Sequence, residues 1–274
     1  MLAAVLLAAT LSPFDQVVAA ERAFSAASVT QGQHEAFLAN LAEDAVSFQP
    51  LPLPARPNHI GQPPSPAKLT WGPAWVAMSG AGDLAVSIGP WQFLAPKHPL
   101  VKPETTGWFI SMWRRQPGGS WKVAVDTSVA LDMLFVIPKT VQNGLGTADP
   151  KPAKPGAEAE ARLGMTAAEQ VFAASAVGGF GAALTAQADP LLRVYRQNKP
   201  AGEGLTASQP LLAADRRKGS CKPGKIVAAA SGDLGYAYGS CTSVDKAHPG
   251  ECAFLHVWRK QPDGSWKVLV DVTP

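Results

Sequence analysis

The chain has 274 residues, of which 46% are hydrophobic, so it can bury a substantial core, and its length suits two domains of ordinary size. The formal net charge is only +3, from 24 basic and 21 acidic residues. Without a Lys- or Arg-rich run that could follow a phosphate backbone, the composition argues against nucleic acid as a partner. Pro and Gly number 25 each but are dispersed, which predicts many turns and argues against a low-complexity protein.

Residues 1–11 form an apolar segment about as long as the core of a signal peptide, and they end in small residues suited to cleavage. The segment is too short to span a bilayer, so no transmembrane span is expected. No Lys or Arg precedes Arg22, so the basic flank that usually opens such a peptide is missing. We expect a periplasmic or secreted protein. The alternative is a cytoplasmic protein whose apolar first turn packs on the first domain.

The first domain is predicted to open with a helix. Ser12 is a capping residue, Pro13 suits the first helical position, and Asp15 places an acid in the first turn. Apolar residues then recur at three- and four-residue spacing as far as Phe24, with Glu21 on the same face. The pattern predicts an amphipathic helix that directs one carboxylate toward the core.

A short second helix over 33–41 and an extended run over 45–49 lead into a Pro-rich excursion over 50–66 that should be irregular. The pattern then changes to alternating apolar residues, which indicates antiparallel sheet. We expect strands at 75–78, 84–91, 107–115 and 121–127. Helices followed by such a meander predict an α+β fold in which the sheet buries one face against the helices.

The last two of these strands belong to a segment that occurs twice. Residues 113–126 and 258–271 are identical at eleven of fourteen positions and lie 145 residues apart, which indicates a tandem duplication. Each copy consists of two alternating runs joined by Pro-Gly-Gly or Pro-Asp-Gly, which favour a hairpin turn. The chain therefore contains two related domains.

Residues 141–164 are rich in Pro, Ala and Gly, and they show no apolar periodicity beyond alanine. They are predicted to form a semi-extended linker. The first domain is then expected at 12–140 and the second at 165–274.

The second domain repeats the plan of the first. Thr166 and Glu169 have the spacing of a capping box, which predicts a helix start. Glu169 and Phe172 repeat the spacing of Glu21 and Phe24. Both domains should therefore begin with a helix that carries a glutamate in its apolar stripe.

These features make each domain resemble the nuclear transport factor 2-like superfamily, particularly its bacterial SnoaL-like members. The resemblance rests on the Glu and Phe of the first helix, the Ser-Gly-Asp-Leu turn at 231–234, and Trp-Arg-x-Gln-x-x-Gly-Ser-Trp-Lys-Val near each domain's end. It implies an α+β class with two cone-shaped domains, each a curved antiparallel sheet packed on N-terminal helices. Isolated members commonly pair through their sheets, so the two domains are expected to form an internal pseudo-dimer.

The resemblance does not carry an enzymatic activity with it, because this fold hosts isomerases, dehydratases, cyclases and many non-catalytic modules. The ketosteroid isomerase and SnoaL branches place an acidic general base near the end of the first strand. Here the nearest counterparts are Gln49 and Arg196, and neither can abstract a proton in that role. The departure counts against catalysis by these routes.

The second domain holds every tyrosine of the chain, and an aromatic cavity with a few hydroxyls and one imidazole would suit a small apolar ligand. The alternative is that these side chains are ordinary core aromatics with satisfied polar tips. The predicted ligand pocket consists of Glu169, Tyr195, Tyr236, Tyr238, Phe254, His256 and Trp258.

Four acidic residues are candidates for acid–base chemistry or for structural roles. If the protein is an enzyme, Glu169 and His256 are the candidate catalytic residues, with Tyr236 as a further acid–base group. Burial in a cavity would raise a carboxyl pKa toward useful values. Glu21 shares that position in the first domain. Asp126 and Asp271 end the last strand of each copy, and the prediction for both is a structural hydrogen-bond acceptor, with a pocket acid as the alternative.

The three cysteines suggest a disulfide. Cys241 and Cys252 bracket a short connection between two strand-like runs, so they are the predicted pair, and Cys221 is left over. Buried free thiols are the alternative. A zinc site that also used His248 and His256 is not expected, because Cys252 and His256 would lie roughly 13 Å apart along one strand.

No glycine loop that could cradle a phosphate opens a helix, so no cofactor is expected. The leading interpretation is an exported, non-catalytic protein that binds a small hydrophobic molecule in the second domain, with the first domain chiefly structural. A cofactor-independent lyase, isomerase or cyclase is one alternative. The other is a protein-interaction module that recruits its partner through an exposed sheet face.

Overall fold

The structure is a computed structural model that describes residues 11–58, 60, 67–94, 105–146 and 152–274. The chain divides into two compact units. Unit one comprises 1–47, 54–78 and 82–150, and unit two comprises 151–274 together with 48–53 and 79–81. The predicted signal segment lies outside the described residues, apart from Leu11.

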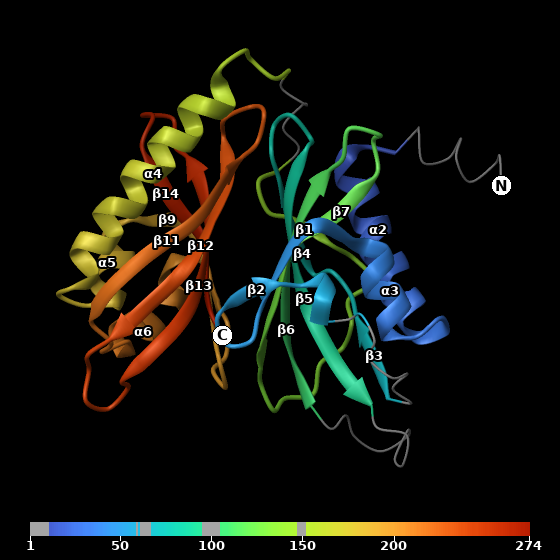
Figure 1. The fold of residues 1–274 in the computed structure, drawn as a ribbon, viewed down its shortest axis with the longest axis horizontal. Helices are drawn as coiled ribbons and strands as arrows, with labels where there is room; N and C mark the ends of the chain where they lie inside the picture. Colours follow the sequence, from blue (N-terminus) through green and yellow to red (C-terminus); the bar gives the residue numbers. More distant parts are fainter. Residues whose placement is uncertain (1–10, 59, 61–66, 95–104, 147–151) are drawn as a thin grey trace. The chain divides into compact units, whose positions relative to one another are not determined.

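Unit one begins with two helices, α2 (Pro13–Thr30) and α3 (Gln33–Asn40), which lie on one face of its sheet (Figure 1). The strand order is β2-β1-β7-β6-β5-β4-β8, with β3 paired to β5. The bounds of these strands, and of one 3-10 helix, are β1 (Leu41–Phe48), β2 (Pro52–Pro54), η1 (Arg56–Asn58), β3 (Lys68–Trp71), β4 (Trp75–Met78), β5 (Leu84–Leu94), β6 (Thr105–Arg115), β7 (Trp121–Ala130) and β8 (Gln142–Asn143).

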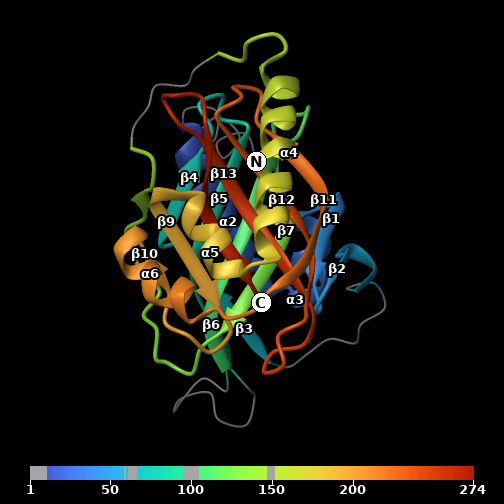
Figure 2. The same ribbon diagram turned by 90° about the vertical axis from the view of Figure 1, so that its left-hand side faces the viewer.

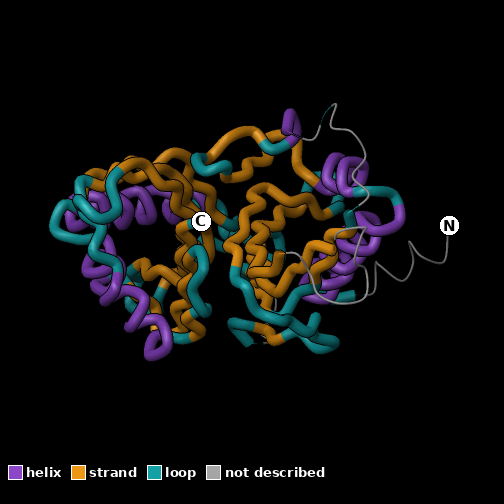
Figure 3. Tube along the Cα trace, turned by 90° about the horizontal axis from the view of Figure 1, so that it is seen from below, coloured by secondary structure: helices purple, strands orange, loops and turns teal. Residues whose placement is uncertain are grey.

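Unit two has three helices on one face of a six-stranded sheet whose order is β10-β9-β14-β13-β12-β11 (Figures 2 and 3). The helices are α4 (Ala157–Ala176), α5 (Phe180–Ala186) and α6 (Leu205–Ala214). The strands are β9 (Ala188–Arg196), β10 (Gly202–Glu203), β11 (Gly219–Ala228), β12 (Leu234–Ser243), β13 (Gly250–Lys260) and β14 (Trp266–Thr273).

The α+β class is confirmed, with one difference in the sheets. The first strand of each unit runs parallel to the second strand of the duplicated hairpin, β1 beside β7 and β9 beside β14. The sheets are therefore mixed and not purely antiparallel. The connection from the helices brings the first strand in beside the end of the meander, where it lies parallel to that hairpin strand.

The predicted start of α2 is confirmed. The Ser12 side chain accepts a hydrogen bond from the backbone N–H of Asp15 at 3.1 Å, and Pro13 occupies the first turn. The buried face of the helix includes Glu21 and Phe24. The apolar spacing therefore placed one carboxylate in the core, as the sequence indicated.

The predicted start of α4 is wrong. The helix begins at Ala157, inside the predicted linker, because the Ala- and Glu-rich run that follows is a good helix former. Thr166 lies in the helix interior, where its hydroxyl donates to the Arg162 carbonyl at 2.8 Å. The same linker prediction also covered β8, which pairs with β4.

The duplicated hairpin forms twice with the same geometry. Gly119 and Gly264 take φ values of 83° and 86°, which a residue without Cβ adopts readily. In each turn the Gln backbone N–H donates to the Ser carbonyl four residues later, at 2.7 Å in both copies. The repeat in sequence is therefore a repeat in structure.

Each unit encloses its own hydrophobic core between helices and sheet. Phe24, Trp113 and Val123 belong to the core of unit one, while Phe172 and Trp258 belong to that of unit two. Over the described ranges, no helix has the length and apolar character needed to cross a membrane.

Candidate functional site

Both units hold a fully buried glutamate against the first tryptophan of the hairpin. Trp113 Nε1 donates to Glu21 Oε2 at 2.7 Å, and Trp258 Nε1 donates to Glu169 Oε1 at 2.7 Å. Both carboxylates have 0% exposure. The duplication therefore extends beyond the hairpin to a buried polar pair that ties the first helix to the sheet.

Unit one contains a cavity of about 230 Å³ beside this pair. Its walls are largely aromatic, and Phe24 packs edge-on against both Phe37 and Trp71 with ring centroids 4.8 Å apart in each case. The lining residues are Phe24, Phe37, Leu69, Trp71, Trp91, Phe109, Asp126, Thr127 and Ser128. A cavity with apolar walls and few polar groups is typical of a small-molecule site.

Asp126 is the one ionisable residue in that lining. Ser111 Oγ donates to its Oδ1 at 3.1 Å. Burial raises the pKa of the Asp126 carboxyl to about 6, although the Ser111 hydrogen bond acts in the opposite direction. The group can therefore exchange a proton near neutral pH, or anchor a ligand that offers a hydrogen-bond donor.

Glu21 lies behind the cavity wall. Its carboxylate accepts the indole N–H of Trp71 at 2.8 Å as well as that of Trp113. Burial raises the pKa of Glu21 to about 7, and the two indole hydrogen bonds limit the rise. The nearby Asp126 adds a smaller upward contribution, so unit one holds two carboxyls with raised pKa values in one core.

In unit two the position of Ser111 is taken by His256, whose ring fills the corresponding space. Its Nδ1 lies 2.9 Å from Glu169 Oε1, and its Nε2 lies 3.5 Å from Asp271 Oδ1. The rings of Phe172 and Phe254 pack against the imidazole with centroids 4.7 and 4.5 Å away. Burial lowers the pKa of His256, but attraction to Glu169 and Asp271 outweighs it and the pKa is raised overall.

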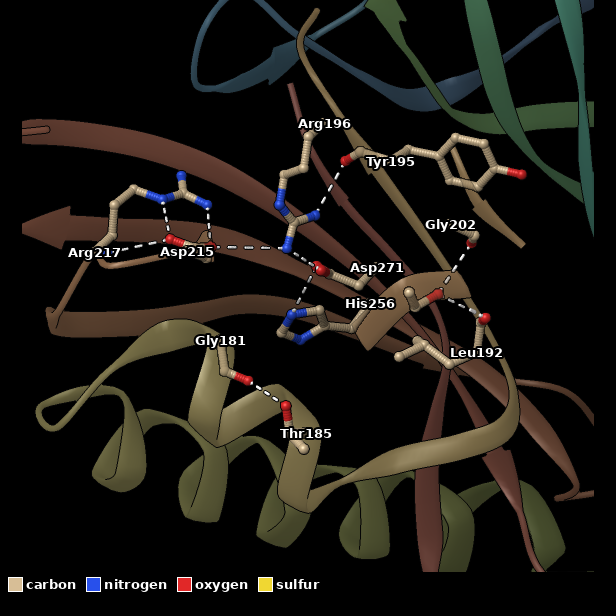
Figure 4. A network of polar contacts seen from close by, with 11 residues as sticks. Gly181, Thr185, Leu192, Tyr195, Arg196, Gly202, Asp215, Arg217, His256 and Asp271 are labelled. Carbon is tan, nitrogen blue, oxygen red and sulfur yellow. Dashed lines mark hydrogen bonds and ion pairs between the residues drawn. The ribbon is translucent and has the colours of Figure 1, made fainter. Parts of the chain in front are cut away.

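The charges continue beyond His256 in an alternating chain (Figure 4). Arg196 Nη2 donates to Asp271 and lies 3.9 Å from Asp215 Oδ2. Arg217 donates twice to Asp215, at 2.8 and 2.7 Å. Each carboxylate thus faces at least one cation, which is the condition under which buried charges are tolerated.

These side chains leave a space of only about 10 Å³ beside His256, enough for about one water. The predicted ligand pocket of the second domain is therefore closed. A surface groove of about 1070 Å³ does lie in unit two, but its lining, which runs from Gly178 to His248, includes none of the predicted pocket residues.

The three tyrosines do not join the predicted pocket. His256 lies opposite Ala237, whereas Tyr236 lies opposite Val257 and Tyr238 opposite Leu255. Directly opposite residues share a face and neighbours along a strand alternate, so both tyrosines face away from His256. Tyr195, which pairs with Val272, also lies on that other face.

Four of the predicted pocket residues do come together: Glu169, Phe254, His256 and Trp258. The residues that sequence reasoning missed are the unit-one walls, above all Trp71 and Trp91. A usable signal existed in the repeat itself, because the small Ser111 stands where the second copy has His256. A small side chain at a core position can leave room for a ligand.

The predicted disulfide is also wrong. Cys221 and Cys241 are bonded, with an S–S distance of 2.01 Å, and Cys252 is free. Cys241 lies directly opposite Cys221 on one neighbouring strand and Cys252 on the other, so both pairings satisfy the strand register. Within the described ranges, no cluster of His, Cys, Asp and Glu side chains is arranged to hold a metal ion.

No protein-family model and no curated protein match the chain. Among solved structures, it is similar to a ketosteroid isomerase-like protein from Erwinia carotovora atroseptica (17% identity, TM-score 0.36, covering 42% of this chain and 95% of that one). It is also similar to an NTF2-like protein with a cystatin-like fold from Novosphingobium aromaticivorans. The identity is 16% and the TM-score 0.34, and the match covers 42% of this chain and 81% of that one.

An NTF2-like protein of unknown function from Shewanella oneidensis gives 13% identity, a TM-score of 0.33, and coverage of 40% of this chain and 96% of that one. Each neighbour spans about the length of one unit. These neighbours are described as NTF2-like or ketosteroid isomerase-like, the same kind of protein that the sequence motifs resemble.

Proposed function

We propose that the protein binds a small, mainly apolar or aromatic molecule in the cavity of unit one, and that unit two serves as its structural partner. The observation that carries the proposal is the difference in free space at matched positions, about 230 Å³ beside Asp126 against about 10 Å³ beside His256. The proposal keeps the predicted ligand class and moves the site to the first domain.

The lining sets the chemistry of the ligand. Phe24, Trp71 and Trp91 offer flat apolar surfaces, which favour an aromatic or alicyclic body. Asp126 favours a ligand that directs a hydroxyl, amide or amine toward the cavity floor. Among the described residues its carboxyl accepts one hydrogen bond, from Ser111, so it retains acceptor capacity. An anionic ligand is disfavoured, since none of the described residues that line the cavity is cationic.

A second candidate function rests on Asp126 alone. A carboxyl whose pKa is about 6, in an aromatic cavity, has the properties of a general base near neutral pH. This supports a cofactor-independent lyase, isomerase or cyclase as the alternative. Deuterium exchange into the α-carbon of a small aryl ketone, followed by NMR, separates the two: catalysis requires exchange that Asp126→Asn abolishes.

We propose in addition that the protein is exported to the periplasm or the cell exterior. The apolar segment at 1–11 and the disulfide between Cys221 and Cys241 support this, because disulfides persist mainly in oxidising compartments. Fractionation of cells that express the full chain with a C-terminal tag would test it.

The binding proposal is tested with phenylnaphthylamine, a neutral fluorescent probe. We expect micromolar binding to the wild-type protein, and a loss of about tenfold or more in Ser128→Trp, because Ser128 is exposed at the cavity and an indole there would block it. Ser128→Ala, which keeps the cavity open, is the matched control. Absence of probe binding to the wild type, or equal binding to both variants, would refute the assignment.

A further inference from the structure

Three cysteines from three neighbouring strands form one row across the sheet of unit two. Cys221 on β11 lies directly opposite Cys241 on β12, which lies directly opposite Cys252 on β13. Directly opposite residues of an antiparallel ladder project to the same face, with Cβ atoms about 4.5–5.5 Å apart. The three sulfur atoms therefore share one face, and Cys241 is in the middle.

The present bond joins Cys221 to Cys241, and it runs along this row. The free thiol of Cys252 consequently approaches Cys241 from the side opposite to Cys221. Thiol–disulfide exchange requires attack of a thiolate on one sulfur of the disulfide while the other sulfur leaves. A row of three sulfurs places the nucleophile, the central sulfur and the leaving group in the order that this displacement needs.

We propose that Cys252 exchanges with the disulfide, so that the bond alternates between Cys221–Cys241 and Cys241–Cys252. The Cys252 thiolate attacks Cys241 Sγ and forms the new bond. The bond to Cys221 breaks, and Cys221 leaves as a thiolate that takes up the proton lost by Cys252. The reaction consumes no oxidant or reductant.

The surroundings of Cys252 leave room for the exchange and set its pH dependence. The small space of about 10 Å³ is lined by both Cys241 and Cys252. Burial raises the pKa of the Cys252 thiol, and the negative charges of Asp215 and Asp271 raise it further. The positive charges of Arg217 and Arg196 lower this pKa, but the net shift is upward. His256 also lines this space, from the same strand as Cys252, and its pKa is raised by Glu169 and Asp271 against the effect of burial.

Because exchange requires the thiolate, it should be slow at neutral pH and should accelerate as the pH rises. The two bonded states are close in loop entropy. Cys221 and Cys241 are 20 residues apart, and Cys241 and Cys252 are 11 apart, so closure in the unfolded chain favours the shorter loop by a factor of only about two. In the folded sheet both pairs already lie on adjacent strands, so loop closure favours neither bond.

The two disulfide states differ in which pair of strands the bond connects. β11 is the edge strand of the sheet, and the Cys221–Cys241 bond ties it to β12. After exchange the tie lies between β12 and β13, and β11 is held at that point by its ladder alone. The exchange would therefore loosen one sheet edge without reduction of the protein.

The test uses the oxidised full chain, incubated at pH 7.0 and at about pH 8.5, quenched with acid, denatured, alkylated and mapped by mass spectrometry. We expect Cys252 to be the main alkylated site and Cys221 a second one, with a combined yield of one thiol per chain. The fraction of Cys221 that is labelled should grow faster with incubation time at the higher pH. Equal results at two protein concentrations show that the exchange is intramolecular.

A matched pair of variants supplies the second measurement. Cys221→Ser should form the Cys241–Cys252 bond under the conditions that oxidise the wild type, whereas Cys252→Ser should show only Cys221–Cys241. Labelling of the wild type at Cys252 alone after a day at the higher pH overturns the proposal. The proposal is also overturned if a folded Cys221→Ser protein keeps two free thiols. It is overturned as well if Cys221 is labelled only in samples that contain intermolecular dimers.

Discussion

The two domains share a frame and differ in the side chains that face their cores, most directly at one matched strand position. In both, a buried glutamate from the first helix accepts an indole hydrogen bond at 2.7 Å. At the strand position opposite the conserved aspartate, unit one has Ser111 and unit two has His256. The serine leaves an aromatic cavity, whereas the imidazole fills it. This substitution within a duplicated frame, together with the other residues that line each core, distinguishes a domain with room for a ligand from one without.

The charge of the two cores differs in the same way. Unit two neutralises Glu169 and Asp271 with His256 and Arg196, so each buried carboxylate has a cationic partner. In unit one, the described residues that donate hydrogen bonds to Glu21 and Asp126 are neutral, and burial raises the pKa values of both carboxyls. A packed, charge-paired core favours stability, while an open core with protonatable acids favours binding or chemistry.

The largest expected change in stability comes from replacing His256 in the packed core of unit two. His256→Ser gives unit two the residue found in unit one and removes the cation between two buried carboxylates. We expect a loss of about 4 kcal/mol in the free energy of unfolding of unit two, because removing one partner strands a buried charge. Urea denaturation followed by fluorescence would measure it.

The control for His256→Ser is Ser111→Ala, which removes a neutral hydroxyl that donates to the Asp126 carboxyl. It should cost no more than about 1 kcal/mol. A loss of similar size in both variants would show that the charge chain contributes little, and that the contrast between the cores is one of shape alone.

The two units should lose stability in different pH ranges. Below pH 4.5 the Glu21 carboxyl is protonated in both folded and unfolded chains. Between 4.5 and about 7 the unfolded chain ionises first, so the stability of unit one falls as the pH rises, by about 3 kcal/mol for this residue. Asp126, whose pKa rises from 3.8 to about 6, adds to the same trend.

The stability of unit two should change over a different pH range. The raised pKa of His256 stabilises the folded unit fully below 6.5, and this contribution is lost as the pH rises through the folded-state value. Hydrogen-exchange pulses given at one common pH, after equilibration in urea at several pH values, would report each unit through its own peptides. Parallel curves for the two units would contradict the assignment of the charges.

The features that could be predicted from the sequence are those set by local pattern. The repeat of Trp113–Asp126 identified the duplication and the hairpin, and the Ser12-Pro13 pair located the first helix. Residues that recur at a fixed spacing in both copies are held by the same frame, so the pattern carries over directly to structure.

The site required information that the local pattern does not contain. Tyr236 and His256 are each placed by alternation within their own strand, but their faces depend on the pairing register between strands. Cys241 faces a cysteine on both sides, so sequence spacing could not select its partner. The number of polar aromatics suggested a pocket in unit two, although free space depends on which side chains fill the core.

A smaller effect is expected when the filled arrangement is moved into unit one. Ser111→His would place an imidazole between Glu21 and Asp126, as His256 lies between Glu169 and Asp271. We expect phenylnaphthylamine to bind about tenfold more weakly, equivalent to about 1.4 kcal/mol, because the ring occupies the cavity floor. Full affinity in a folded Ser111→His protein would mean that the probe binds elsewhere. Ser111→Ala again serves as the control that keeps the cavity open.

The smallest effect concerns the charge of Asp126. Because its pKa is about 6, the carboxyl is mainly neutral at pH 5 and mainly ionised at pH 8. A neutral apolar probe disfavours the ionised form, which loses solvation when the cavity is filled. The affinity for phenylnaphthylamine should therefore fall about threefold between these pH values in the wild type and stay constant in Asp126→Asn. A cationic aromatic amine should show the opposite trend, since the ionised carboxylate attracts it. If the variant keeps the pH dependence of the wild type, the titrating group is not Asp126, and Glu21 becomes the next residue to replace.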